Sequence, residues 1–245
     1  MVTTSLKTQP GSGEVLLYRA DVPSLAPSII TRLNAKLSRD ERGRAARFVF
    51  EKDRTVFIAA HALLRHALGL IFEESAIGFR TNAYGKPELD LAFEHDIHFN
   101  LSHTRGMAVC AISRGHAIGV DVEAIDRSVD VEMLAQQYFA ASEHELVVEA
   151  PPEQRMEIFF RLWTLKEAML KAVGTGLAVP PLREFAFTLE PLTLKLQPAW
   201  VEAGLEWQVW EDAPTAVHRL ALAVRRSPAQ PIDVAGHLIP LEQLI

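Results

Sequence analysis

Two acidic residues, Asp121 and Glu123, stand one residue apart in the otherwise apolar run 118–123. Side chains two residues apart on a β-strand point to the same face, so both carboxylates share one face while Val120 and Val122 point to the other. Neighbouring carboxylates repel each other, and a hard divalent cation with oxygen ligands relieves that repulsion. The pair indicates a metal site. A half-buried strand with its acidic face in water is the alternative that the pair alone leaves open.

A second set of chemical groups falls on a predicted helix over residues 159–171. At helical spacing, one stripe of this helix carries Phe160, Trp163, Thr164, Glu167 and Lys171. A carboxylate on the same face as aromatic side chains needs a partner, because burying it bare is costly. Glu167 is therefore a candidate ligand or catalytic group. The alternatives are an ordinary i,i+4 pair of Glu167 with Lys171, worth about 0.3–0.5 kcal/mol, and a solvated Lys166.

A histidine follows a serine at the end of a predicted strand over residues 98–101. Adjacent strand residues face opposite sides, so Ser102 and His103 do not form a nucleophile–base pair with each other. His103, followed by a threonine, an arginine and a glycine, is placed to grip a phosphate. A half-exposed histidine with no ligand is the alternative.

Basic side chains gather between residues 42 and 54, and one more stands in a predicted turn at residues 82–87. They are Arg42, Arg44, Arg47, Lys52, Arg54 and Lys86. Arg44 and Arg47 are about one helical turn apart, and arginine forks match pairs of phosphate oxygens. An anion-binding cluster and a solvated helix face both fit this pattern.

The composition narrows the class of protein. The 245 residues carry 25 basic and 31 acidic side chains, a formal charge of −6, and 49% of them are hydrophobic. Proteins that bind nucleic acid through its phosphates usually show the opposite charge balance, so we expect no nucleic acid partner. Cys110 is the single cysteine, which excludes an internal disulfide and a thiolate metal site. The polar start 1–13 and the lack of a long apolar run predict a cytoplasmic protein that does not associate with membranes.

The elements that must position these residues follow the order strand, helices, strands, and this order occurs twice. In the first half, the patterns predict a strand over residues 14–22, helices over 29–37 and 40–50, a helix capped by Asp53, and strands over 98–101 and 107–113. Ser38, with Glu41 three residues later, is typical of a capping box at the start of the second helix.

The second half begins with a predicted strand over residues 117–123, continues with helices and ends with strands. The patterns predict helices over residues 133–139 and 153–173, a helix opened by a capping box of Ser142 and Glu145, and strands over 185–189, 207–210 and 217–224. Gly174 and Gly176 end the long helix, and the tail from Ser227 is expected to be irregular. This order predicts an α+β protein of two lobes with similar layout, residues 1–115 and 116–245.

The motifs together resemble those of the Sfp-type 4′-phosphopantetheinyl transferases, in that family's order and spacing over residues 38–177. The matching segments are Arg47-Phe48 with Asp53-Arg54, Tyr84-Gly-Lys-Pro87, Phe99-Asn-Leu-Ser-His103, Ile118-Gly-Val-Asp-Val-Glu123 and Trp163-Thr-Leu-Lys-Glu-Ala-Met-Leu-Lys171. The last two segments are highly specific as a pair. The resemblance implies two pseudo-symmetric α+β lobes with coenzyme A in the cleft between them. It also implies transfer of phosphopantetheine to a serine of a carrier protein, with release of adenosine 3′,5′-bisphosphate.

The resemblance further implies a role for each matching residue. The metal ligands are Asp121, Glu123 and Glu167, binding Mg²⁺ or alternatively Mn²⁺. The residues assigned to coenzyme A are Arg44, Arg54, Thr55, Lys86, Ser102, His103, Lys166 and Lys171, with His103 at the 3′-phosphate. Glu167 is the candidate general base, directly or through a water, and Lys171 stabilises the leaving phosphate. Glu41 stands where some relatives carry a lysine, and Arg42 is its candidate substitute.

Three hypotheses of function fit these residues. The first is the transferase, whose partners are coenzyme A and an apo acyl carrier protein or peptidyl carrier domain. The second is a coenzyme A- or carrier-binding protein without catalysis, against which the acidic triad with Lys171 argues. The third is a metal-dependent phosphodiesterase, against which the basic cluster and His103 argue.

The carrier surface is expected in residues 129–149, which include Met133 and Leu134. The expected role of this segment is to dock the carrier's helix. The alternative is an ordinary amphipathic helix that packs on the core. Two lobes that supply a complete cleft predict a monomer. The sequence does not indicate whether the carrier serves fatty acid, polyketide or peptide synthesis.

Overall fold

Two groups of elements, each with its own hydrophobic core, form the protein in a computed structural model. The structure describes residues 9–73, 77–93, 95–125, 128–174, 182–198 and 201–245. Unit 1 contains the chain up to Asn82 together with Pro87–His116 and Ile232–Ile245, and unit 2 contains Ala83–Lys86 and Ala117–Pro231. The mixture of helices and strands confirms the α+β class.

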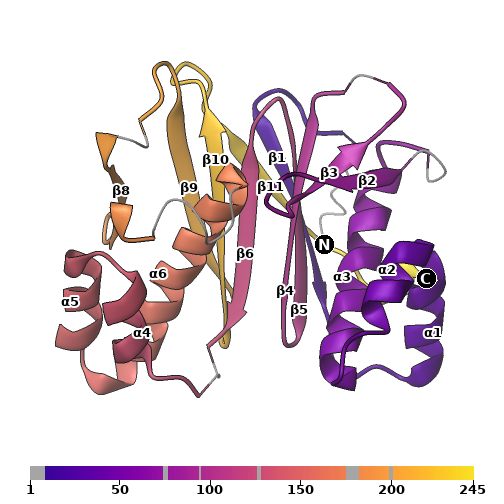
Figure 1. The fold of residues 1–245 in the computed structure, drawn as a ribbon, viewed down its shortest axis with the longest axis horizontal. Helices are drawn as coiled ribbons and strands as arrows, with labels where there is room; N and C mark the ends of the chain where they lie inside the picture. Colours follow the sequence, from indigo (N-terminus) through magenta and orange to yellow (C-terminus); the bar gives the residue numbers. More distant parts are fainter. Residues whose placement is uncertain (1–8, 74–76, 94, 126–127, 175–181, 199–200) are drawn as a thin grey trace, which may run out of the picture. The chain divides into compact units, whose positions relative to one another are not determined.

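Unit 1 is a four-stranded sheet covered by helices (Figure 1). Its elements are β1 (Glu14–Asp21), α1 (Pro27–Lys36), α2 (Arg39–Ala45), α3 (Glu51–Gly69), β2 (Gly78–Thr81), β3 (Pro87–Asp90), β4 (Ile97–Thr104), β5 (Met107–Arg114), β11 (Asp233–Leu238) and a 3-10 helix at Leu241–Leu244. The strand order is β11-β1-β5-β4, and β2 pairs with β3 in a separate hairpin. Helix α3 packs against β1, β4 and β5, and its buried side chains are mostly apolar.

Local sequence signals explain the helices of unit 1. The Ser38 hydroxyl accepts the Glu41 N–H at 3.2 Å, and the Glu41 carboxylate accepts the Ser38 N–H at 2.7 Å, which confirms the predicted capping box. The helix it opens ends at Ala45 instead of reaching residue 50. Helix α3 then begins at Glu51, two residues before the predicted cap at Asp53.

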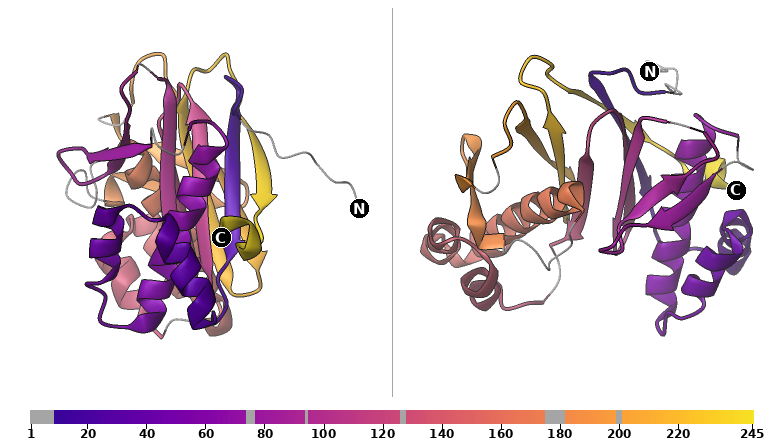
Figure 2. Two further views of the ribbon diagram at one scale, coloured as in Figure 1. Left: turned by 90° about the vertical axis from the view of Figure 1, so that its right-hand side faces the viewer. Right: turned by 45° about the horizontal axis from the view of Figure 1, so that its top comes forward.

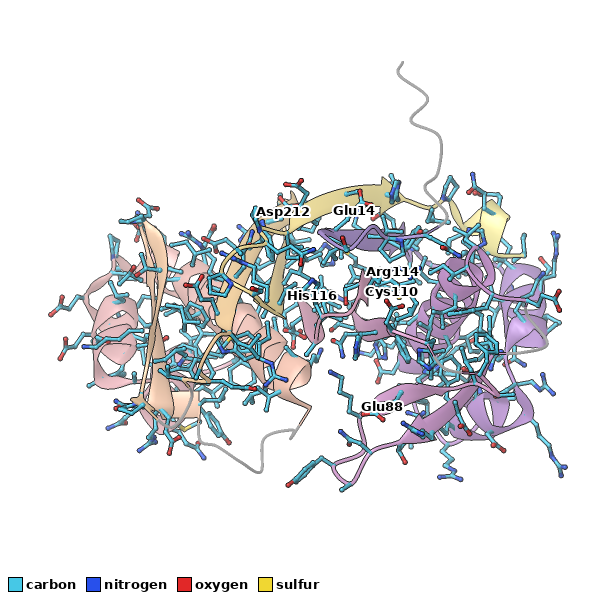
Figure 3. All side chains as sticks on the ribbon, turned by 90° about the horizontal axis from the view of Figure 1, so that it is seen from above. Glu14, Glu88, Cys110, Arg114, His116 and Asp212 are labelled. Atoms are coloured by element: carbon cyan, nitrogen blue, oxygen red, sulfur yellow. The ribbon has the colours of Figure 1, made fainter. Side chains whose placement is uncertain are left out.

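The single cysteine lies in the centre of the sheet of unit 1. Cys110 is on β5, fully buried, and its place is labelled in Figure 3. Burial raises the pKa of this thiol, because the thiolate would be desolvated. Cys110 is therefore an unreactive core residue.

Unit 2 is a three-stranded antiparallel sheet packed on one long helix (Figure 2). Its elements are β6 (Ile118–Ala124), α4 (Val131–Tyr138), α5 (Ala141–Glu149), α6 (Pro152–Val173), a 3-10 helix at Leu182–Glu184, β7 (Phe185–Leu189), β8 (Leu192–Leu196), β9 (Glu206–Thr215) and β10 (His218–Arg226). The strand order is β6-β10-β9, and α6 packs on β6 and β10. None of the helices within the described ranges combines the length and the apolar character that a membrane span requires.

The ends of two helices in unit 2 test the predicted caps. Gly174 ends α6 in the left-handed conformation with φ 82°, as predicted, and Gly176 lies outside the described residues. The predicted capping box at Ser142 is wrong. Helix α5 starts after Ala140, and the Glu143 carboxylate accepts the Ala140 N–H at 3.0 Å.

The C-terminal segment departs from the expected irregular tail. Strand β11 pairs in parallel with β1, with Glu14 opposite Asp233 and Arg19 opposite Leu238. The segment Ile232–Ile245 therefore belongs to unit 1, although the prediction placed it in the lobe 116–245. A parallel pairing between the two ends of a chain leaves no local turn signal, because its partner is remote in sequence.

Candidate functional site

The predicted acidic residues of unit 2 meet where β6 packs on α6. Asp121 lies on β6 and is 4% exposed, while Glu123, two residues on, is half-buried. Lys171, on the last turn of α6, places its Nζ 2.6 Å from Asp121 Oδ1. Glu167 lies one turn earlier on the same helix. The strand pair and the helix pair therefore form one group, which we call the acidic group: Asp121, Glu123, Glu167 and Lys171.

Glu167 has an environment that disfavours its charge. Burial raises the pKa of Glu167, and the negative charge of Asp121 raises it further. Lys171 opposes these effects, Glu123 adds to them, and the resulting pKa is about 7. Its Oε1 atom is buried and has no hydrogen-bond partner among the residues that the structure describes. A group of this kind is suited to accept a proton near neutral pH or to bind a cation.

The chemistry of the acidic group fits a hard divalent cation. Its three carboxylates supply oxygen ligands only, and the orphaned Oε1 of Glu167 needs a positive partner. As the side chains stand, no three His, Cys, Asp or Glu residues of the described ranges converge closely enough to hold a metal. The ammonium of Lys171 rests on Asp121 instead. A bound cation therefore requires these side chains to turn toward one another.

Lys166 is not part of this group, although it precedes Glu167 in the sequence. Its side chain is completely buried, and its Nζ lies 2.7 Å from Glu143 Oε2. The same ammonium donates to the carbonyl oxygens of Leu182 and Phe185, each at 2.7 Å. These three acceptors match the three donors of an ammonium. Assigning Lys166 to coenzyme A is therefore corrected: it is a core residue that ties α6 to α5 and β7.

Lys86 contacts the two elements of unit 2 that carry the acidic group, β6 and α6. Its Nζ donates to the carbonyl oxygens of Ile118 at 3.2 Å and Ala172 at 3.3 Å. These carbonyls belong to the start of β6 and the last turn of α6. In this structure the Lys86 ammonium thus contacts the two elements that carry the acidic group.

The predicted phosphate contacts of unit 1 gather around Phe57. The guanidinium carbon of Arg44 lies 5.4 Å from the centre of the Phe57 ring, and the His103 ring lies 6.3 Å from it. Arg44 and His103 are exposed, whereas Ser102 is buried, as expected for neighbours on a strand. We call Arg44, Phe57 and His103 the aromatic platform.

Two further candidates stand at the start of α3. Arg54 is half-buried and Thr55 is 9% exposed. Both lie within the first turns of the helix that carries Phe57. Their position is compatible with a ligand at the platform.

Glu41 has a structural role in place of a ligand contact. It is buried, and its carboxylate forms hydrogen bonds with His61 Nδ1 at 3.0 Å and with Arg65 Nε at 2.7 Å. Burial alone would raise the pKa of Glu41, but these hydrogen bonds and that from the Ser38 backbone lower it to about 2. Arg42, its proposed substitute, donates to the Leu37 carbonyl.

Two residues that the sequence reasoning missed shape these sites. Phe57 has no role in the sequence analysis, yet its ring, which is 3% exposed, lies against both Arg44 and His103. Gly119 was read as part of an apolar run. A glycine inside a strand marks a close backbone approach, which is its role against α6.

The predicted carrier-docking segment lies on α4 and α5. Met133 is 54% exposed, whereas Leu134 is half-buried and packs against the core of unit 2. Leu146 on α5 is 42% exposed. The segment therefore presents some apolar side chains to solvent and uses others as core.

Comparison with known proteins places these residues within a family. Residues 117–223 match the profile of the 4′-phosphopantetheinyl transferase superfamily. The chain is 42% identical over 194 residues to the 4′-phosphopantetheinyl transferase HetI of Nostoc sp. strain PCC 7120, an alignment that covers 77% of this chain and 81% of HetI.

Other relatives share a shorter stretch. The 4′-phosphopantetheinyl transferase gsp of Aneurinibacillus migulanus is 35% identical over 150 residues, which cover 60% of this chain and 60% of gsp. The 4′-phosphopantetheinyl transferase Sfp of Bacillus subtilis strain 168 is 29% identical over 152 residues, which cover 61% of this chain and 65% of Sfp. Among solved structures, the holo-acyl-carrier-protein synthase of Thermotoga maritima aligns with a TM-score of 0.37 and 24% identity, over 45% of this chain and 63% of that chain.

Proposed function

Because the chain belongs to the 4′-phosphopantetheinyl transferase family, we propose that it transfers the 4′-phosphopantetheine group from coenzyme A to a serine of an apo carrier protein. The serine oxygen attacks the phosphorus that bears pantetheine. The P–O bond within the pyrophosphate breaks, and adenosine 3′,5′-bisphosphate leaves with the electron pair. The serine proton passes to a base on the protein.

The observation that carries this proposal is the acidic group, which lies within the residues that match the family profile. Asp121, Glu123 and Glu167 are the proposed ligands of Mg²⁺, or alternatively Mn²⁺. Such an ion, when bound, supplies positive charge next to the phosphate oxygens. Glu167 is also the proposed acceptor of the serine proton, directly or through a water.

Lys171 has a second role in this proposal. Its ammonium lies 2.6 Å from Asp121 Oδ1, and its long, flexible side chain is 28% exposed, so it can turn toward negative charge on a bound phosphate. Positive charge at the leaving phosphate lowers the barrier to breaking the pyrophosphate bond. Lys171 is therefore proposed to stabilise the leaving group.

The aromatic platform of unit 1 is the proposed site for the nucleotide end of coenzyme A. Arg44 and His103 offer donors for phosphate oxygens, and His103 is assigned to the 3′-phosphate. The remaining residues proposed to lie near the cosubstrate are Arg54, Thr55, Lys86 and Ser102. Lys86 contacts protein carbonyls in this structure, so its proposed phosphate contact is additional to those bonds.

The two other hypotheses receive less support. A protein that only binds coenzyme A or a carrier has no need for a carboxyl group with a pKa of about 7 beside two further carboxylates. The exposed Arg44 and His103 beside the Phe57 ring favour a large phosphorylated cosubstrate over hydrolysis of a simple phosphodiester. The relatives named above are transferases.

The partner is proposed to be an apo acyl carrier protein or a peptidyl carrier domain. Its docking helix would contact the exposed apolar residues Met133 and Leu146. We further propose a monomer in the cytoplasm, on the sequence grounds given above.

Mass spectrometry of the carrier tests the proposed function. The protein is incubated with coenzyme A, Mg²⁺ and an apo carrier, and the carrier should gain the mass of one phosphopantetheine group. Release of adenosine 3′,5′-bisphosphate should match that gain. A folded protein that modifies none of several apo carriers overturns the proposal. Cleavage of coenzyme A without any carrier would favour the phosphodiesterase.

A further inference from the structure

We propose that Gly119 and Lys86 are positioning residues that hold β6 and α6 in the register required by the acidic group. Neither residue needs to touch the reacting atoms for this role. The inference rests on the proposed function for the meaning of the acidic group, but it concerns packing within unit 2 and is testable on the free protein.

Gly119 allows the strand and the helix to touch through their backbones. A Cβ atom at this position would overlap the carbonyl oxygen of Ala168 and the amide nitrogen of Ala172, and would lie 2.9 Å from the carbonyl carbon of Lys171. These are backbone atoms of α6, so they cannot turn aside as the end of a flexible side chain can. Any residue other than glycine therefore forces α6 away from β6.

The position of this contact connects it to the acidic group. Gly119 is two residues before Asp121 on the same strand, so both face α6. The helix residues that it touches lie beside Glu167 and include Lys171. The 2.6 Å contact between Lys171 Nζ and Asp121 Oδ1 leaves little room for a helix displaced by even one ångström.

Lys86 joins the same two elements by hydrogen bonds at the level of Gly119. Its ammonium donates to Ile118, which precedes Gly119, and to Ala172, whose amide nitrogen faces Gly119. Because α6 ends at Val173, the Ala172 carbonyl lies in the last turn, where carbonyl oxygens lack the i+4 N–H donor that the helix interior supplies. A cation is also favourable at a helix C-terminus. Lys86 thus supplies a partner for that carbonyl and links it to the strand.

This role predicts effects that a simple phosphate contact does not. If Lys86 only bound coenzyme A, its loss would raise the KM for coenzyme A and leave the metal affinity of the free protein unchanged. If Lys86 positions the acidic group, its loss weakens metal binding in the absence of coenzyme A and lowers kcat as well. Groups that orient metal ligands typically change metal affinity by about 10–100-fold when mutated.

The test compares Lys86→Met with Lys195→Met, which removes an exposed lysine from β8. Mn²⁺ is titrated into each protein without coenzyme A or carrier, and the free ion is followed by electron paramagnetic resonance. We expect Lys86→Met to bind Mn²⁺ about 10–100-fold more weakly than the wild type, and Lys195→Met to match the wild type. Equal Mn²⁺ affinity in all three proteins overturns the positioning role of Lys86.

Hydrogen exchange supplies a readout that needs no metal. The Gly174 N–H donates to the Leu170 carbonyl at 2.8 Å and reports on the last turn of α6. In Lys86→Met this amide should exchange about tenfold faster, because the Ala172 carbonyl has lost a charged donor. Unchanged exchange at Gly174 contradicts the proposal.

Gly119→Ala tests the backbone contact separately. Its affinity for Mn²⁺ should fall at least as much as that of Lys86→Met. If Gly119→Ala does not fold, the Lys86→Met results still decide the proposal. A folded Gly119→Ala protein with wild-type Mn²⁺ affinity overturns the role of Gly119. Failure of the wild type to modify any carrier would instead remove the proposed function, and the Mn²⁺ and exchange results would stand apart from it.

Discussion

Lys171 on α6 and Asp121 on β6 form an ion pair, with Nζ and Oδ1 2.6 Å apart, at the centre of the acidic group. The Asp121 side chain is 6% exposed and the Lys171 side chain 28%. The pair has two consequences. It offsets the charge of one carboxylate of three, and it places an ammonium group on an oxygen for which a divalent ion would compete.

Addition of Mg²⁺ should stabilise the metal-free protein. An ion that binds only the folded state adds about 2.7 kcal/mol to the free energy of unfolding at a concentration 100 times its Kd. Thermal unfolding with EDTA and with excess Mg²⁺ measures this effect. Asp121→Asn should remove most of the Mg²⁺-dependent rise in Tm. Glu153→Gln, an exposed acidic residue at the start of α6, should keep it, and an equal rise in both variants would argue against the site.

Glu167→Gln should abolish turnover far more than coenzyme A binding. A general base contributes about 10²–10⁴-fold to a rate, and the amide neither accepts the serine proton nor binds a cation as a carboxylate does. The fold should tolerate the change, because the pKa of Glu167 of about 7 shows that its charge is disfavoured in the metal-free protein. Carrier modification measures kcat and calorimetry measures coenzyme A affinity. Equal loss of both would make Glu167 a structural residue.

The sequence predicts those features that depend on neighbouring residues. The capping box of Ser38 and Glu41, the left-handed stop at Gly174 and the strand that carries Asp121 are set by local backbone chemistry. The pairing of β11 with β1 is set by contacts between the two ends of the chain, for which no local pattern exists. The predicted helix of residues 40–50 likewise ended early, at Ala45.

The candidate site likewise combines features that the local sequence predicts with features that only the tertiary fold sets. Asp121 and Glu167 could be brought together only by adding family order to the strand and helix spacing, and the structure does place Glu167 within the electrostatic influence of Asp121. Lys166 could not be placed correctly from its spacing. Its neighbour Glu167 faces the acidic group, and the helix turns Lys166 into the core toward Glu143, a partner that only the tertiary fold supplies.

His103→Ala should weaken binding of coenzyme A and leave binding of 3′-dephospho-coenzyme A nearly unchanged. A charge-assisted hydrogen bond is worth about 1.5–3 kcal/mol, so the KM for coenzyme A should rise about 10–100-fold. Arg44→Ala should act in the same direction, because Arg44 shares the Phe57 ring with His103. His98→Ala, an exposed histidine on the same strand, serves as the control. An equal rise in KM for both cosubstrates would place His103 away from the 3′-phosphate.

Glu41 should make unfolding sensitive to acid. Its pKa of about 2 in the folded protein lies below the ordinary value of 4.5, so its stabilising effect is complete above pH 4.5 and is lost as the pH falls toward 2. The difference corresponds to about 3 kcal/mol. Urea unfolding of wild type and Glu41→Gln between pH 7 and pH 2.5 measures it. The wild type should lose most of this stability over that interval, and Glu41→Gln should lack it at every pH. Glu51→Gln, on the exposed first turn of α3, should follow the wild type.

Lys166→Met should destabilise unit 2, because it leaves the Glu143 carboxylate in the core without its cation. Both side chains are fully buried, and burial raises the pKa of Glu143 and lowers that of Lys166. Removing one partner of such a pair costs about 3–5 kcal/mol, and replacing both partners costs less.

Urea unfolding of Lys166→Met, Glu143→Gln and the double variant therefore gives a measurable coupling energy between the two residues. The double variant should be more stable than the sum of the single changes predicts, since it leaves no unpaired charge. Glu143→Gln retains an amide oxygen that can accept the Phe187 N–H, now held by the carboxylate at 2.8 Å. A Lys166→Met protein that keeps wild-type stability but loses coenzyme A affinity would return Lys166 to the cosubstrate site.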